Sequence, residues 1–230
     1  MEFAQRTNRA ARDEARVSRI LHLSCHADDE SLGCGGTLLA HHAAGDEILW
    51  AVVTSPKPGG QWSAEEIGRK KWERQLAAEA YGFAHRWELD FPAALLDRVP
   101  MTRLVNRIQA VVENAAPDVV YTVSAEDWHS DHRMVALATQ AAIRPHRTGV
   151  RRLIECETIS AGRGSIGHPT LYWDITAHLD RKVEILKLYA SEYGGDSLRN
   201  EEAVRTWARF RGAEVGRAAA EAFRLVWAVE

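Results

Sequence analysis

Cysteine is scarce in this chain of 230 residues, which has three, at Cys25, Cys34 and Cys156. Small secreted domains that depend on disulfides carry many cysteines, usually in even numbers, so this count favours a reducing compartment. The chain also lacks the roughly 20 consecutive apolar residues that a transmembrane helix needs. Its first 19 residues, rich in Arg and Glu, have no apolar core of signal-peptide length. We therefore expect a cytoplasmic protein without a membrane span.

A surplus of basic residues is also absent. Lys and Arg number 29 and Asp and Glu number 32, so the formal net charge is −3 and nucleic acid is not the expected partner. Hydrophobic residues make up 46% of the chain and charged residues 27%, which argues against disorder, collagen and coiled coil. The length suits one α/β domain. We expect a polar arm or helix over residues 1–18 and a single domain over residues 19–230.

Seven short apolar runs, rich in β-branched and aromatic residues, predict buried strands. They lie at residues 20–25, 48–54, 86–91, 119–123, 153–159, 171–175 and 223–229. Helical patterns separate these runs. Ser63 and Glu66 form a capping box for a helix that ends at Gly82, and a shorter helix is expected from Thr37, after the glycine-rich residues 33–36. This alternation predicts an α/β fold with a mostly parallel sheet and helices on both faces.

Two clusters of His and carboxylate residues follow predicted strands, where sheets of this kind place their sites. The run HADDE occupies residues 26–30, directly after the first strand, and HSDH occupies residues 129–132, after the strand at 119–123. His and Asp are common ligands of a divalent metal such as zinc. Bound zinc lowers the pKa of water to about 7, a further carboxylate can accept a proton, and a His can stabilise an oxyanion. Together the clusters predict a metal-dependent hydrolase.

Each cluster alone also has a structural interpretation. The acidic residues 28–30 could form the first turn of a helix, where negative charge is favourable, and His129 could be a surface loop residue. Residues 33–36 could suggest phosphate binding, although they match neither GxGxxG nor a P-loop. A nucleotide-binding module and a metal-binding domain without turnover are therefore the less favoured alternatives.

The two clusters resemble the signatures of the PIG-L/LmbE-like zinc deacetylases. Residues 26–36 are similar to the motif AHPDDE-x-x-G-x-G-G, and residues 129–132 are similar to HxDH. Softer similarities at residues 117–120, 189–192 and 211–223 extend the resemblance over most of residues 19–228. Two departures stand out, because Ala27 replaces the usual Pro and Glu192 replaces the usual Gln. Neither departure removes a core catalytic position.

The resemblance implies a Rossmann-like fold and hydrolysis of an N-acyl group, usually the acetyl group of N-acetylglucosamine within a larger molecule. By motif, the zinc ligands would be His26, Asp29 and His132, and Fe²⁺ or another divalent metal could replace zinc in the cell. Asp28 would be the general base. His129 would stabilise the oxyanion or protonate the amine, and Asp131 would orient His129.

Three further residues are candidate substrate contacts. Trp128 is next to His129, Trp62 lies in a Gly/Pro-rich loop, and aromatic faces commonly stack on sugar rings. Lys70 stands where the family often has Arg. We expect a small-molecule amino-sugar substrate. The alternative is an amidase that cleaves a thiol-sugar conjugate or another acylated amine. A homo-oligomer is compatible with the family, but no interface can be recognised in the sequence.

Overall fold

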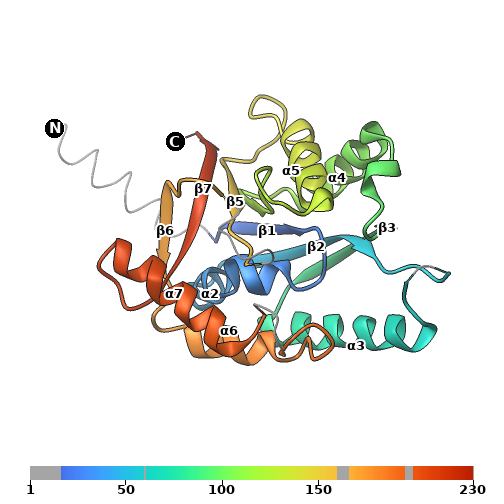
Figure 1. Cartoon of the computed structure of the whole chain (residues 1–230). Helices are drawn as coiled ribbons and strands as arrows, with labels where there is room; N and C mark the ends of the chain where they lie inside the picture. Colours follow the sequence, from blue (N-terminus) through green and yellow to red (C-terminus); the bar gives the residue numbers. More distant parts are fainter. Residues whose placement is uncertain (1–16, 60, 160–165, 195–198, 230) are drawn as a thin grey trace.

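The computed structural model describes residues 17–59, 61–159, 166–194 and 199–229, so most of the expected N-terminal arm lies outside the described residues. Within these ranges seven strands form one sheet in the order β3-β2-β1-β4-β5-β7-β6 (Figure 1). Their bounds are β1 Arg19–Ser24, β2 Glu47–Ser55, β3 His85–Pro92, β4 Val119–Thr122, β5 Arg152–Cys156, β6 Leu171–Asp174 and β7 Ala220–Ala228. Only β7 runs antiparallel to its neighbours among these strands. The seven predicted strands and the mostly parallel sheet are confirmed.

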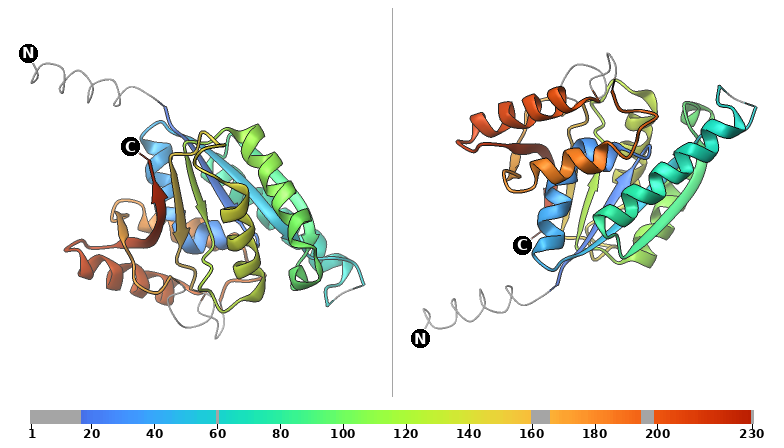
Figure 2. Two further views of the ribbon diagram at one scale, coloured as in Figure 1. Left: turned by 90° about the horizontal axis from the view of Figure 1, so that it is seen from above. Right: turned by 90° about the horizontal axis from the view of Figure 1, so that it is seen from below.

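Helices cover both faces of the sheet, as predicted (Figures 1 and 2). One face carries α4 (Met101–Ala115) and α5 (Ser130–Ala142). The other carries α2 (Asp29–Ala43), α3 (Ala64–Tyr81), α6 (Leu179–Leu186) and α7 (Glu201–Glu214). The strands alternate between two cores, since Leu21 packs with Leu104 under α4 while Ile20 packs with Leu38 of α2. No described helix is long and apolar enough to cross a membrane.

The start of α2 differs from the prediction. The helix begins at Asp29, eight residues before the expected start at Thr37, and it runs through the glycines with a kink at Cys34 (φ −147°, ψ 24°). These glycines allow close packing: a Cβ on Gly36 would come within 2.7 Å of the Ile175 side chain. By contrast, α3 begins as predicted, because the Ser63 side chain accepts a hydrogen bond from the Glu66 amide. The glycines therefore mark a helix packed against the sheet side, and the first cluster lies at its N-terminus.

A buried ion pair holds the second part of α2. Lys182 Nζ lies 2.7 Å from Glu221 Oε1, and both side chains are at most 4% exposed. Glu221 also accepts hydrogen bonds from the amides of Gly36 and Thr37, at 2.8 Å each. Because the kink at Cys34 interrupts the helical hydrogen bonds, Glu221 serves as a cap for the segment that follows it.

We expect Glu221→Ala to lower the free energy of unfolding by about 3–5 kcal/mol, because it leaves the buried Lys182 ammonium without its partner. Urea denaturation would measure this loss. The control is Glu113→Ala on α4, whose carboxylate is exposed and bonded to Gln109, and which should change stability by no more than about 0.5 kcal/mol. A loss below about 1 kcal/mol for Glu221→Ala would contradict the prediction.

Candidate active site

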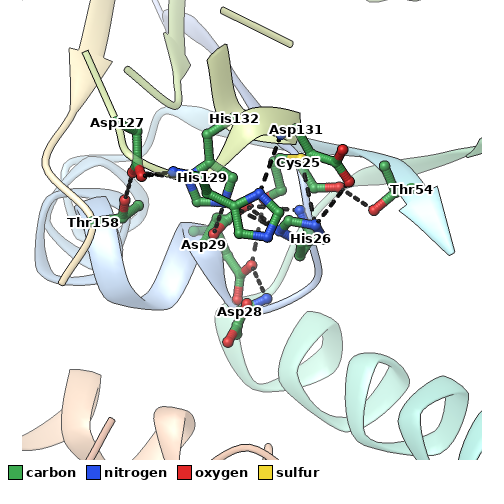
Figure 3. A network of polar contacts seen from close by, with 12 residues as sticks. Cys25, His26, Asp28, Asp29, Thr54, Asp127, His129, Asp131, His132 and Thr158 are labelled. Atoms are coloured by element: carbon green, nitrogen blue, oxygen red, sulfur yellow. Dashed lines mark hydrogen bonds and ion pairs between the residues drawn. The ribbon is translucent and has the colours of Figure 1, made fainter. Parts of the chain in front are cut away.

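The two clusters meet at the carboxyl ends of neighbouring parallel strands (Figure 3). His26 follows β1, and α2 begins three residues later. The loop after β4 leads to His129, which is the N-cap of α5. Because β1 and β4 are adjacent in the sheet, residues about 100 positions apart in the chain come into contact there.

Three nitrogen and oxygen donors converge between the clusters. His26 Nδ1 lies 3.1 Å from His132 Nε2 and 3.8 Å from Asp29 Oδ2, and His132 Nε2 lies 3.3 Å from Asp29 Oδ1. Donors bound about 2.0–2.2 Å from one ion are separated by similar distances, so the three fit a shared divalent metal. The Cys25 thiol belongs to the same group, all within 4.8 Å, and was not among the expected ligands.

The electrostatics of this group favour a cation. Burial alone would lower the pKa of His132, but the carboxylates of Asp29 and Asp127 raise it to about 10. Burial alone would raise the pKa of Asp29, yet His132 and His26 hold it below its usual value. The negative charge that stabilises a protonated His132 would equally stabilise a divalent cation at the same place.

Each of the two converging imidazoles has a carboxylate at its other nitrogen. Asp127 Oδ2 lies 2.9 Å from His132 Nδ1, and Asp131 Oδ2 lies 3.5 Å from His26 Nε2. Carboxylates in this position orient metal-binding His side chains and fix their tautomers. Asp127 is buried, also accepts a hydrogen bond from the Thr158 hydroxyl at 2.6 Å, and was not predicted. Thr158 follows β5, so no local sequence pattern could have indicated this partner.

His129 is arranged differently from the expectation. The Asp131 carboxylate accepts hydrogen bonds from the amides of Ala94 and Leu96, at 2.6 and 3.2 Å, and no hydrogen bond from it to the His129 ring is found among the described residues. Instead, His129 Nδ1 accepts a hydrogen bond from the Asp131 amide at 3.2 Å. Burial and the neighbouring imidazoles lower the pKa of His129 to about 4. The ring is therefore neutral, with its proton on Nε2.

Asp28 is held in an unusual backbone conformation. Its φ is 135° and its ψ is −19°, a region that non-glycine residues rarely adopt. Its amide donates a hydrogen bond to Glu30 Oε2 at 3.1 Å, and its side chain is buried. Burial raises the pKa of Asp28 to about 6 although Arg199 Nη1, 3.4 Å from Oδ2, opposes the shift. Among the described residues Oδ2 has no hydrogen-bond partner.

A cavity of about 510 Å³ lies over the clusters. Its wall includes His26, Asp28, His129, Tyr189, Glu192 and Arg199. The expected substrate contacts Trp62 and Lys70 also line it, whereas Trp128 does not and is 62% exposed. Sequence reasoning missed Arg199 as a wall residue, because it lies in an irregular segment far from both clusters in the chain.

Comparison with known proteins identifies the family. The model of the PIG-L family, described as GlcNAc-PI de-N-acetylase, matches residues 21–143. This chain belongs to the PIG-L family. It is 26% identical to the diacetylchitobiose deacetylase of Thermococcus kodakarensis, over 91% of this chain and 84% of the relative. It is 24% identical to the 2'-N-acetylparomamine deacetylase of Streptomyces fradiae, over 86% and 82% respectively. The PIG-L chain is thus an amide-hydrolysing deacetylase.

The fold itself is shared with enzymes of other chemistry. GalB, the 4-carboxy-2-hydroxymuconate hydratase from Pseudomonas putida KT2440, superimposes with a TM-score of 0.73 and 19% identity, covering 93% of this PIG-L chain and 98% of GalB. A likeness at this level shows the fold alone. The reaction therefore has to be argued from the residues of the site.

The conformation of Asp28 predicts an unusual order of stabilities. We expect Asp28→Gly to be about 1 kcal/mol more stable than Asp28→Asn, because only glycine adopts φ 135° without cost. Both variants should lose deacetylation. Urea denaturation compares the two, with the pair Asp97→Gly and Asp97→Asn as the control, since Asp97 has no positive φ and glycine should be no better there. Equal or reversed stability at position 28 would contradict the prediction.

Proposed function

We propose that this PIG-L protein is a zinc-dependent N-deacetylase that acts on a small molecule or glycoconjugate containing N-acetylglucosamine. The observation that carries the proposal is the convergence of His26, Asp29 and His132 in one cavity with the buried Asp28 carboxylate and the neutral His129 ring. These groups provide a metal site, a proton acceptor and a hydrogen-bond donor within reach of one substrate.

His26, Asp29 and His132 are the proposed zinc ligands. When bound, zinc polarises the acyl carbonyl and makes water more acidic. The same donor types also bind Fe²⁺, so the choice of zinc rests on its preference for two imidazoles and a carboxylate. Asp127 and Asp131 hold the two rings with their free nitrogens toward the ligand group.

Asp28 is the proposed general base. Its pKa of about 6 leaves the side chain ionised at pH 7, where it can accept a proton from the attacking water. His129 presents Nε2–H, which can donate a hydrogen bond to the oxyanion formed from the acyl carbonyl. The amine is then released with the proton that Asp28 accepted, and acetate is the second product.

The size and lining of the cavity support a sugar substrate. Trp62 offers a flat apolar face, and Lys70 offers a charged donor for hydroxyl groups. The two relatives named above are a diacetylchitobiose deacetylase and an acetylparomamine deacetylase, which both have amino-sugar substrates in their names. Similarity to these proteins supports an N-acetylated amino sugar as the substrate here.

The test is acetate release by metal-stripped enzyme reloaded with Zn²⁺. The panel contains N,N'-diacetylchitobiose, simple N-acetylglucosamine glycosides, an N-acetyl sugar nucleotide and an N-acyl thiol-sugar conjugate. We expect acetate from at least one N-acetylglucosamine compound, loss of bound metal in His132→Ala, and an activity loss of about 10²–10⁴-fold in Asp28→Asn with zinc retained. An enzyme that binds less than about a tenth of an equivalent of metal after reloading would overturn the proposal.

Asp127 gives a separate prediction about metal affinity. We expect Asp127→Asn to bind zinc about 10–100-fold more weakly, because the charged partner of His132 Nδ1 is lost while the shape of the side chain is kept. Competition with a chromophoric chelator measures this affinity without any substrate. Asp97→Asn, on a surface turn, is the control and should bind zinc like the parent protein. Unchanged affinity in Asp127→Asn would show that its carboxylate does not act through His132.

A further inference from the structure

Glu192 lies between two cations in the wall of the cavity. Its Oε2 is 2.6 Å from Arg199 Nη1, and its Oε1 forms an ion pair with Lys70 Nζ. Arg199 also reaches Asp28 Oδ2 at 3.4 Å. All three side chains of this group, Lys70, Glu192 and Arg199, are 22–31% exposed and line the cavity, so a substrate at the clusters would meet them.

Other acidic groups of the wall are also paired within the protein. Glu88 binds Arg74 at 2.8 Å, and Asp90 forms an ion pair with Lys57. Glu73 accepts hydrogen bonds from the amide and hydroxyl of Ser191. The wall therefore carries many charges, which largely cancel one another by internal pairing.

The position of Glu192 decides what Lys70 and Arg199 can bind. Two cations that share one carboxylate form a site for an anionic substituent, but here a carboxylate of the chain itself occupies that site. An anionic substrate would have to displace Glu192, break two ion pairs and lie near Asp28. Neutral hydroxyl groups can donate to Glu192 and accept from the cations at the exposed edges without breaking these pairs.

We propose that Glu192 is a specificity-determining residue, which restricts this site to N-acetylated sugars without an anionic group next to the reacting sugar. The inference rests on the proposed function and adds the substrate class to it. Glu192 stands where the family signature has a neutral Gln, so its charge is a property of this chain.

The experiment uses three glycosides of N-acetylglucosamine that differ only in the end of a short alkyl aglycone, which is neutral, a carboxylate or an ammonium group. Acetate release by the zinc-loaded enzyme gives kcat/KM for each. For the parent enzyme we expect the neutral glycoside to be preferred over the carboxylate by at least about tenfold, because like charges are brought together. A parent enzyme that prefers the carboxylate would overturn the inference without any variant.

Glu192→Gln should raise the ratio of carboxylate to neutral kcat/KM by at least about tenfold, because Lys70 and Arg199 lose the carboxylate that they share. The control is Glu202→Gln on the exposed side of α7, which should leave the ratio unchanged. Lys70→Gln combined with Glu192→Gln should remove most of the gain, since one of the two cations is then absent.

The outcomes separate the two proposals. If the zinc-loaded parent enzyme releases acetate from none of the glycosides or the earlier panel, the proposed function fails. If acetate is released but Glu192→Gln leaves the ratio unchanged, the role of Glu192 fails and the proposed function stands. A gain that persists in the double variant would also overturn the inference, because it would not arise from the cations that Glu192 occupies.

Discussion

The structure of the site depends on His132 being held between two buried carboxylates. Asp29 lies 3.3 Å from one nitrogen of the ring and Asp127 lies 2.9 Å from the other. Asp29 begins α2, whereas Asp127 and His132 belong to the loop after β4 and to α5, so this contact ties the two clusters together. Two carboxylates can remain charged in a buried place only with a positive partner. The arrangement therefore demands a cation, either a proton on His132 or a metal ion beside it.

The packing of α2 carries the first cluster to this point. The glycines allow the helix to lie close to Ile175 and Cys156, and Glu221 with Lys182 holds the segment after the kink. At the other end, Asp28 keeps a backbone conformation that costs energy by itself. Strain of this kind persists only where the surrounding structure holds it, here the start of α2 and the hydrogen bond to Glu30. Stability elsewhere in the helix thus offsets the conformation of the proposed base.

The mouth of the cavity follows a different logic. Its charged side chains come from α3 and from the segment between α6 and α7, which are distant from the clusters in sequence. The same fold supports a hydratase as well as deacetylases, so the common sheet positions the chemistry without choosing the substrate. In this protein the choice lies in how Lys70, Glu192 and Arg199 pair at the wall.

The sequence by itself determined the sheet, its helices and the meeting of the two clusters. Strand runs are recognised by local composition, and parallel neighbours place residues 26–30 and 129–132 at one edge. Only the tertiary structure decided that α2 starts at Asp29, that Asp127 binds His132, and that Asp131 pairs with His26. It also decided that Glu192 lies between Lys70 and Arg199. The physical reason is that a hydrogen bond or ion pair depends on distances of about 3 Å between side chains of different elements, and local sequence patterns do not encode those distances.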